Sequence, residues 1–411
     1  MPDSTLVNLH HSLRQARERW AVFLGAGASY DYGIPTMVEM ADILRGLIRT
    51  SKPDHEVSKS TLGLLRKLCP GQDSTTATWN IEELLTRLYE LLHATASRHS
   101  GFAPVTAAVG QSAVPPEAIA RASDELIAFM AKMCKLSSHE YTDHGEGQVG
   151  YLADFFLAMA SFGRPANRLI RVFSTNIDLC VEAAMVRLSQ RARADRRPDL
   201  ILVDGFDSSM LPTLDMASYR RQAASFRDRC AVCYWKLHGS IDWTYSQAID
   251  SGGPATRDAA YSDQSIIVRR TDDGLWESLV RSGALSGHQP TGKQRIVIFP
   301  TPAKYLETYT SPYMDMFEAF RRTLEEIELL VCVGTSFPDQ HIRSAIRSFV
   351  ERDNTLLFVI DPHVKDNTLK ACFGPSRSVQ PVIAVGFSEF VEEFRLLDAL
   401  GEPHRKEEGA H

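Results

Sequence analysis

The chain has 411 residues, of which 44% are hydrophobic and 23% charged, and these values are ordinary for a globular protein and exclude a wholly disordered or fibrous one. Its 45 Lys and Arg against 51 Asp and Glu give a formal net charge of −6, which does not favour a protein that mainly coats nucleic acid, because such binding depends on neutralising phosphates. Seven cysteines are an odd and low count for this length, so they predict reduced thiols rather than a disulfide framework.

Neither the first residues of the chain nor its apolar runs predict a secretory signal or a membrane helix. The first residues hold no basic segment followed by an apolar run, and no apolar run reaches the roughly 20 residues of a membrane helix. We therefore expect a soluble, cytoplasmic protein that does not bind membranes. Cys230 and Cys233 form one Cys-x-x-Cys pair, but a structural zinc needs a second pair and none follows, so we expect no metal.

The first 160 residues are predicted to be mostly helical. A short apolar run from Trp20 to Leu24 stops at Gly25, which predicts a buried strand and a glycine turn. Helices are expected over residues 5–19, from Thr36 onward, and over 80–93 with Asn80 as N-cap, 116–135 and 150–162, with a loop over 97–115.

Strands and helices alternate after residue 164. Strands are expected over residues 168–174, 199–203, 231–237, 295–299, 329–333, 355–360 and 379–385. Helices are expected over 179–193, 313–327, 339–351 and 387–399, and loops over 250–256 and 284–293. This alternation predicts an α/β fold with a doubly wound, mostly parallel sheet covered by helices on both faces. The predicted domains are the sheet domain (1–39 and 164–400), a helical insertion (40–163) and a flexible tail (401–411).

A glycine-rich segment, Gly25-Ala26-Gly27-Ala28-Ser29, follows the first predicted strand directly. In a doubly wound fold the pyrophosphate of a nucleotide binds at this end of a strand, and glycines let the backbone approach it closely. A bare Gly-x-Gly is also a common strand-ending turn, as is Gly33-Ile34-Pro35. Tyr30 stands where the third glycine of the dehydrogenase fingerprint belongs, which argues against hydride transfer.

Polar residues also follow the other predicted strands. These segments are Thr175-Asn176-Ile177-Asp178, Leu237-His238-Gly239, Gly334-Thr335-Ser336 and Asp361-Pro362. Each has a plain structural alternative, since Asn and Asp cap helices, a lone histidine is often structural, and Asp361 could cap a turn before the proline. Parallel strands bring their carboxyl ends to one edge of the sheet, and the coincidence of five polar strand ends there predicts a ligand site.

Taken in this order, the segments at 25–29, 33–35, 175–178, 237–239 and 334–336 resemble the sirtuin-like family (silent information regulator type). Members bind NAD on a Rossmann-like domain and break the bond between nicotinamide and ribose. The resemblance implies that NAD is the substrate, and it implies NAD-binding roles for Gly25, Ala26, Gly27, Ser29, Pro35, Thr175, Gly334, Thr335, Ser336 and Asp361.

The resemblance also implies three catalytic residues. Asn176 would order the nicotinamide ribose and an attacking water, Asp178 would hold the nicotinamide amide, and His238 would act as general base. An imidazole suits that task because its reference pKa is about 6.5.

Two departures separate the chain from the protein deacylases of that family. Thr36-Met37-Val38 stands where deacylases carry Asp-Phe-Arg, and the four-cysteine zinc module is missing. The helical block with Asn80-Ile81-Glu82-Glu83-Leu84 is similar instead to divergent bacterial sirtuin-like proteins of anti-phage defence. That similarity implies an NAD+ hydrolase, a homo-oligomer and a partner such as a HerA-type ATPase. The acidic charge balance argues against direct nucleic-acid binding. An NAD-dependent deacylase and a non-enzymatic NAD or ADP-ribose sensor stay as alternatives.

Overall fold

The computed structural model describes residues 4–69, 81–96, 107–109, 112–136, 150–162, 169–195, 200–206, 214–225, 230–248, 266–269, 288–297 and 312–401. The chain forms two compact units. The first, which we call the sheet unit, comprises Met1–Gly33, Leu136–Leu237 and Asp315–His411. The second unit comprises Ile34–Lys135 and His238–Met314.

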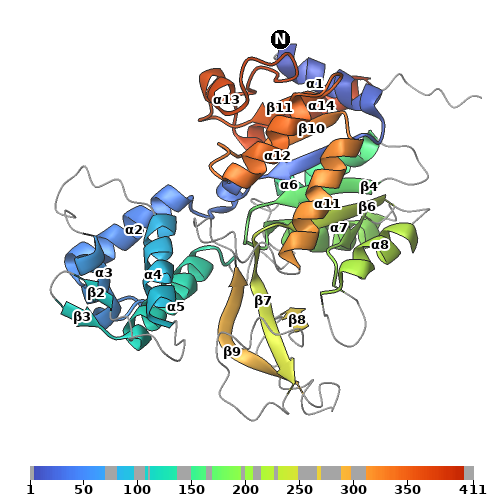
Figure 1. Ribbon diagram of the computed structural model, residues 1–411. Coiled ribbons are helices and arrows are strands. Elements are labelled where there is room, and N and C mark those ends of the chain that lie inside the picture. Colours follow the sequence, from blue (N-terminus) through green and yellow to red (C-terminus); the bar gives the residue numbers. More distant parts are fainter. Residues whose placement is uncertain are drawn as a thin grey trace, which may run out of the picture. The chain divides into compact units, whose positions relative to one another are not determined.

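The sheet unit is built on a six-stranded parallel sheet (Figure 1). Its strands are β1 (Trp20–Leu24), β4 (Leu169–Ser174), β5 (Leu200–Val203), β6 (Cys230–Lys236), β10 (Leu329–Val333) and β11 (Leu356–Ile360), in the order β11-β10-β1-β4-β6-β5. Every residue of β1 and β10 is buried, as expected for parallel strands covered on both faces. The chain first builds the sheet away from β1 on one side and then crosses to β10 on the other. The predicted α/β fold with a mostly parallel, doubly wound sheet is therefore confirmed.

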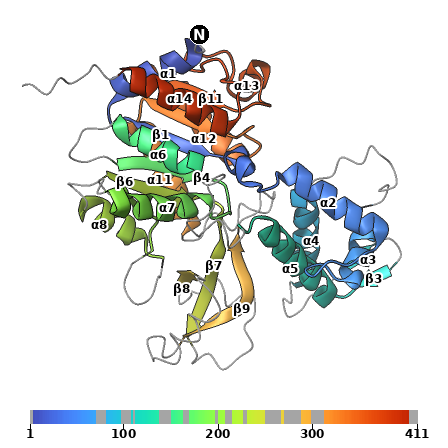
Figure 2. The same ribbon diagram turned by 180° about the vertical axis from the view of Figure 1, so that it is seen from behind.

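Helices cover both faces of this sheet. They are α1 (Ser4–Ala16), the 3-10 helix η1 (Ala26–Tyr32), α6 (Gly150–Ser161), α7 (Cys180–Asp195), α8 (Met216–Ser225), α11 (Tyr313–Glu326), α12 (Gln340–Val350), α13 (Asp366–Phe373) and α14 (Phe387–Gly401). Figure 1 shows α11 and α12 in front of the sheet, and the reverse view in Figure 2 shows α6 and α14 in front. On the first face Phe320 of α11 lies against Phe23 and Phe173, with ring centroids 5.7 and 5.0 Å apart. On the other, Phe155 of α6 packs on Phe387 of α14 at 5.1 Å.

The second unit joins a helical segment to a small antiparallel sheet. The helical segment holds α2 (Met37–Thr50), α3 (Lys59–Leu68), α4 (Ile81–Ala96), the hairpin of β2 (Ala107–Val109) and β3 (Ser112–Val114), and α5 (Pro116–Met133). The sheet has the order β8-β7-β9 and contains β7 (Gly239–Ala248), β8 (Ile266–Arg269) and β9 (His288–Val297). Helix α2 begins with a capping box, in which the Thr36 side chain accepts from the Glu39 amide and Glu39 accepts from the Thr36 amide.

Three of the predicted elements are wrong. The loop expected over 97–115 contains the β2–β3 hairpin, and the loop expected over 284–293 contains the first residues of β9. The strand expected over 379–385 forms only isolated bridges, from Val379 to Leu357 and from Ile383 to Ile360. Whether a segment pairs with another strand decided each case, and local composition does not report such pairing. The predicted cap at Asn80, the loop over 250–256 and the tail beyond residue 401 lie outside the described residues.

The two units have other bounds than the predicted domains. Helix α6, placed in the predicted helical insertion, belongs to the sheet unit, where its Phe155 packs on α14. Residues 238–314, placed in the predicted sheet domain, belong to the second unit together with the helical segment 34–135. The chain therefore passes between the units four times, after Gly33, Lys135, Leu237 and Met314.

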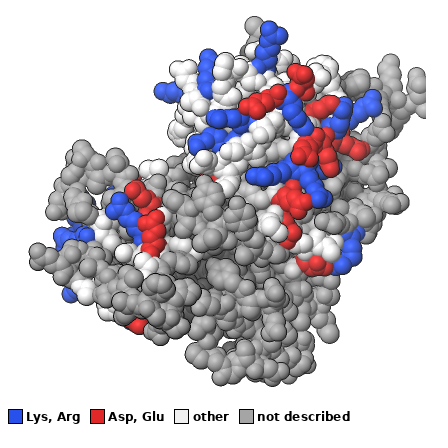
Figure 3. All heavy atoms as spheres, in the orientation of Figure 1, with Lys and Arg blue, Asp and Glu red and all other residues white. Residues whose placement is uncertain are grey.

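Charge on the sheet unit is mixed. On the face in Figure 3, basic and acidic side chains are interspersed over its described part. Ion pairs such as Arg19–Glu328 and Arg322–Glu318 bring opposite charges together in that unit. Within the described ranges, no helix has both the length and the apolar character needed to cross a membrane.

Candidate functional site

The ends of five parallel strands are aligned in register. The last residues of these strands pair in the row Ile360, Val333, Leu24, Ser174 and Lys236. The chain continues from each of them beyond the same edge of the sheet. Two positions further on in the sheet unit stand three of the predicted site residues, which are Thr335, Ala26 and Asn176, whereas His238, two positions after Lys236, begins a segment of the second unit. The alignment thus explains why predicted site residues from separate strand ends of the sheet unit fall at one edge.

The glycine segment after β1 is locked to the segment after β10. The amides of Gly25 and Gly27 donate to the carbonyl oxygens of Val333 (2.8 Å) and Gly334 (2.9 Å). A Cβ on Gly27 would lie 2.7 Å from the Cα of Gly334, and one on Gly25 would lie 2.5 Å from the Gly334 oxygen. These glycines are therefore needed for the close approach of two loops. Because their amides already bond to carbonyls, their contribution to ligand binding would be space rather than a hydrogen bond.

Asn176 ties the segment after β4 to this glycine segment. Its Nδ2 donates to the Gly25 oxygen (2.9 Å) and to the Ser29 hydroxyl (3.0 Å), and its own amide donates to the Ser174 hydroxyl (2.9 Å). The Gly25 carbonyl can only accept, so the nitrogen end of the Asn176 amide must face it. Among the described residues no donor reaches Oδ1, which leaves this oxygen as an acceptor for a ligand or a water.

Asp178 caps the start of helix α7, which is the structural alternative considered for it from the sequence. Its Oδ1 accepts from the amide of Cys180, the first residue of α7, at 2.9 Å. Asp178 is 4% exposed and Cys180 is fully buried. Burial raises the pKa of the Cys180 thiol well above its usual value, and the Asp178 carboxylate raises this pKa further. The thiol beside Asp178 is therefore neutral.

The residues after β10 and β11 also have structural partners. Thr335 Oγ1 accepts from the Phe337 amide at 3.2 Å, while the Ser336 side chain is exposed. Asp361 Oδ1 accepts from the amides of His363 (2.7 Å) and Val364 (3.0 Å), which is the turn cap weighed as its structural alternative.

The remaining predicted residues lie in different surroundings. Thr175 extends the pairing of β4, since its amide donates to the Leu24 oxygen at 3.3 Å. His238 is buried, follows Leu237 directly and is the first residue of a segment of the second unit. Pro35 is half-buried, precedes the Thr36 cap of α2 and belongs to the second unit.

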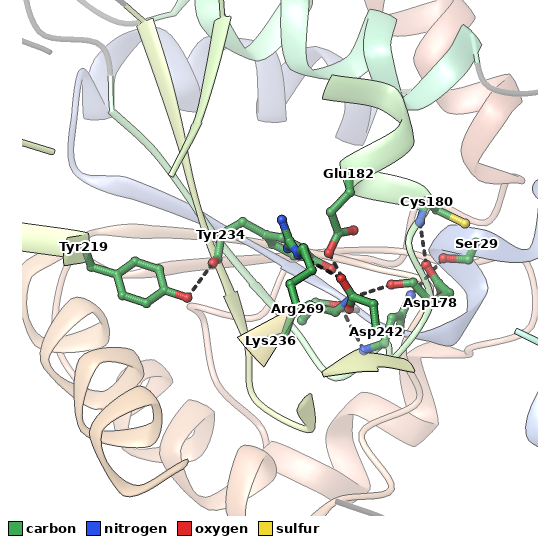
Figure 4. Close-up of polar contacts among 11 residues, drawn as sticks. Ser29, Asp178, Cys180, Glu182, Tyr219, Tyr234, Lys236, Asp242 and Arg269 are labelled. Atoms are coloured by element: carbon green, nitrogen blue, oxygen red, sulfur yellow. Dashed lines mark hydrogen bonds and ion pairs between the residues drawn. The ribbon is translucent and has the colours of Figure 1, made fainter. Parts of the chain in front are cut away.

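Three residues that support this edge were missed from the sequence. Lys236, the last residue of β6, is buried and contacts both the backbone oxygen of Asp178 and the carboxylate of Glu182 (Figure 4). Tyr151 of α6 donates its hydroxyl to the Ala28 oxygen at 2.9 Å and so gives the glycine segment a further contact. The sequence signal that could have indicated the Lys236 contact is a lysine inside the apolar run 230–237, because a buried lysine needs polar partners.

Tyr234 lies in the same buried layer as Lys236. Burial raises the pKa of its hydroxyl well above the usual value, and the negative charges of Glu182 and Asp178 raise it further. The Lys236 ammonium lies 5.7 Å from the centroid of the Tyr234 ring, within the range of a cation–π contact. Figure 4 also draws the pair of Asp242 and Arg269, which lies within the second unit at 2.8 Å.

A metal centre was not expected from the sequence. In the part of the chain that the structure describes, no group of three or more His, Cys, Asp or Glu residues is arranged to hold a metal ion. All seven cysteines are free.

Residues 170–372 match the family model described as the SIR2-like domain. The match runs from β4 to α13, so it includes Asn176, Asp178 and His238 but does not reach the glycine segment. No curated protein is detectably similar to the chain.

Solved structures of Sir2 proteins are similar to the chain at low identity. A mutant Sir2 homologue in complex with ADP-ribose is 12% identical with a TM-score of 0.39, and the comparison covers 98% of this chain and 100% of that one. A Sir2 homologue in complex with NAD is 12% identical with a TM-score of 0.41, covering 95% of this chain and 94% of that one.

Proposed function

We propose that the protein is an NAD+ glycohydrolase, which cleaves NAD+ to nicotinamide and ADP-ribose. The observation that carries the proposal is Asn176, whose amide is fixed by the Gly25 carbonyl and the Ser29 hydroxyl while its Oδ1 has no donor among the described residues. An acceptor held rigidly at the strand ends is what the ordering of a ribose hydroxyl and a water requires. The SIR2-like match over residues 170–372 supports NAD as the substrate.

In this proposal the loops after β1 and β10 hold the ADP-ribose half of NAD. The small residues from Gly25 to Ser29 leave room for the phosphates, and Thr335, Ser336 and Asp361 contact the rest of that half. Parallel α/β sheets bind nucleotides at this edge, beside the strand where the direction of sheet building reverses. Here that strand is β1, which has β10 on one side and β4 on the other.

The chemistry is the exchange of one bond for another at the anomeric carbon of the nicotinamide ribose. Nicotinamide leaves with the electrons of the glycosidic bond, and the ribose passes through a transition state with oxocarbenium character. Asn176 Oδ1 positions the water that attacks this carbon, and Asp178 holds the nicotinamide amide. His238 takes the proton from the water as general base.

His238→Ala tests the proposed base. We expect the variant to fold and to lose nicotinamide release by roughly a hundredfold or more, because general-base catalysis contributes on that order. The measurement is nicotinamide release from NAD+ by chromatography, with circular dichroism as the check on folding. His363→Ala is the matched control, since His363 follows β11 and has no proposed role. Full activity in a folded His238→Ala protein would remove this residue from the mechanism.

Two rival activities use the same edge of the sheet. An NAD-dependent deacylase would produce O-acyl-ADP-ribose from an acyl-lysine peptide, which mass spectrometry detects beside nicotinamide. A sensor would bind NAD or ADP-ribose tightly and release no nicotinamide. We place hydrolysis first because the Asp-Phe-Arg segment of deacylases is replaced by Thr36-Met37-Val38, and Thr36 here caps α2.

We further propose that the hydrolase acts in anti-phage defence by depleting NAD, as a homo-oligomer that works with a partner ATPase of the HerA type. This part rests on the similarity of the helical segment around residues 80–84 to defence proteins. Light scattering of the purified chain, alone and with a co-expressed ATPase, measures both assemblies.

A further inference from the structure

We propose that Lys236 and Glu182 form a positioning pair that fixes the backbone of residues 175–178, on which Asn176 and Asp178 stand. The proposal rests on the proposed function, since it concerns the geometry of the same site. In this proposal neither Lys236 nor Glu182 touches the substrate.

Lys236 meets the loop at its backbone rather than at a side chain. Its Nζ donates to the carbonyl oxygen of Asp178 and, at 3.0 Å, to Oε1 of Glu182. The Lys236 side chain is 2% exposed and that of Glu182 is 12% exposed, so the pair is screened from water. Figure 4 shows Glu182 extending from helix α7 toward the lysine.

The pair joins three elements at the sheet edge. Lys236 ends β6 and lies in register with Ser174, which ends β4, and the Leu237 amide donates to the Ser174 oxygen at 2.8 Å. Glu182 is in the first turn of α7. The loop of residues 175–178 thus leaves one strand, is held by the end of the next strand, and enters a helix that holds the same lysine.

Stability alone is a weak reason for such a pair. Burying two charges costs desolvation free energy, and apolar residues of similar size often replace a buried ion pair without loss. An apolar replacement cannot, however, supply a donor to the Asp178 carbonyl. The structure therefore predicts that stability and loop geometry respond differently when both charges are removed together.

The test compares Lys236→Met with the double variant Lys236→Met/Glu182→Met. We expect the single variant to lose thermal stability, because it removes the ammonium group that faces a buried carboxylate, and the double variant to regain most of that loss. In the double variant we expect faster amide hydrogen exchange over residues 175–180 than in the wild type. We also expect nicotinamide release to fall by roughly ten- to a hundredfold, since small misplacements at a reacting centre cost that much.

A matched control removes an ion pair elsewhere. Lys132→Met/Asp54→Leu deletes the pair that closes at 3.0 Å in the second unit, and we expect it to leave exchange over residues 175–180 unchanged. A second apolar filling, Lys236→Leu/Glu182→Met, guards against a double variant that fails to fold.

Hydrogen exchange decides the proposal independently of turnover. Faster exchange over residues 175–180 in a double variant of wild-type stability supports positioning. Exchange at the wild-type rate in that variant overturns it and leaves the pair a stabilising role only. Failure of the wild type to release nicotinamide would count against the proposed function. The hydrogen-exchange result would still show whether Lys236 and Glu182 fix the backbone of residues 175–178.

Discussion

Gly334 is the residue at which two loops of the sheet edge come closest. Its φ is +63°, in the left-handed region that favours glycine, and a Cβ there would lie 2.2 Å from the Ala28 nitrogen. The contact explains a pattern that the sequence presented as a ligand-binding signature. Glycines at 25, 27 and 334 are required by the packing of loop on loop, whether or not a phosphate binds beside them.

A side chain at position 334 has two costs, which are the left-handed backbone conformation and the clash of its Cβ with the neighbouring loop. Comparing Gly334→Ala with a second glycine variant separates them. Gly33 also has a positive φ, +79°, in the left-handed region, but nothing lies within 4 Å of its Cβ position. Gly33→Ala should therefore lose only the backbone term of about 1–2 kcal/mol, and Gly334→Ala that term plus about 1–3 kcal/mol of overpacking. Urea unfolding of both variants measures the difference. Equal losses would show that the loops can separate without cost.

At the scale of the element, strand ends were the predictable part of the site and side-chain networks were not. The apolar runs of β1 and β10 end where predicted, so Gly25 and Gly334 fall beyond the sheet as expected. The contact of Lys236 with Glu182 joins residues 54 positions apart, and no local pattern reports such a pairing. For Asp178 the sequence could not separate two roles, because capping α7 and holding a ligand require the same residue type at the same place.

Asp54 links the segment after α2 to the end of α5 in the second unit. Lys132 Nζ lies 3.2 and 3.0 Å from its two carboxylate oxygens, and this contact, followed by the His55 amide, holds the pKa of Asp54 below its usual value. A lowered folded pKa stabilises the protein above the unfolded pKa of about 3.9, and this contribution disappears as pH falls through the folded pKa.

Asp54→Asn should therefore destabilise the protein at neutral pH and matter less in acid. The side chains of Lys132 and Asp54 are 38% and 25% exposed, so we expect a loss of no more than about 1 kcal/mol. Urea unfolding of wild type and variant from about pH 7 down to about pH 3 measures the gap, which should close toward the acid end. A gap that widens on acidification would contradict the assignment.

At the scale of the whole molecule, the alternation of strands and helices was enough to predict the parallel sheet, but not the division into units. The segments 34–135 and 238–314 are far apart in sequence yet belong to one unit. Their grouping depends on tertiary contacts, and the strand β7 starts directly after His238 with antiparallel rather than parallel partners. The fold class and the sheet edge thus followed from periodicity, while the assembly of the second unit required the structure.

The proposed hydrolase and the place of its site are tested by measuring nicotinamide release from NAD+ by the purified protein and by the variant Asn176→Ala. Asn8→Ala, which removes an exposed amide on α1, is the control. We expect release by the wild type and by Asn8→Ala, and a loss of roughly a hundredfold in Asn176→Ala, because both the fixed acceptor and the tie to the glycine segment are gone. Equal release by a folded Asn176→Ala protein would contradict the placement of the site at this edge of the sheet.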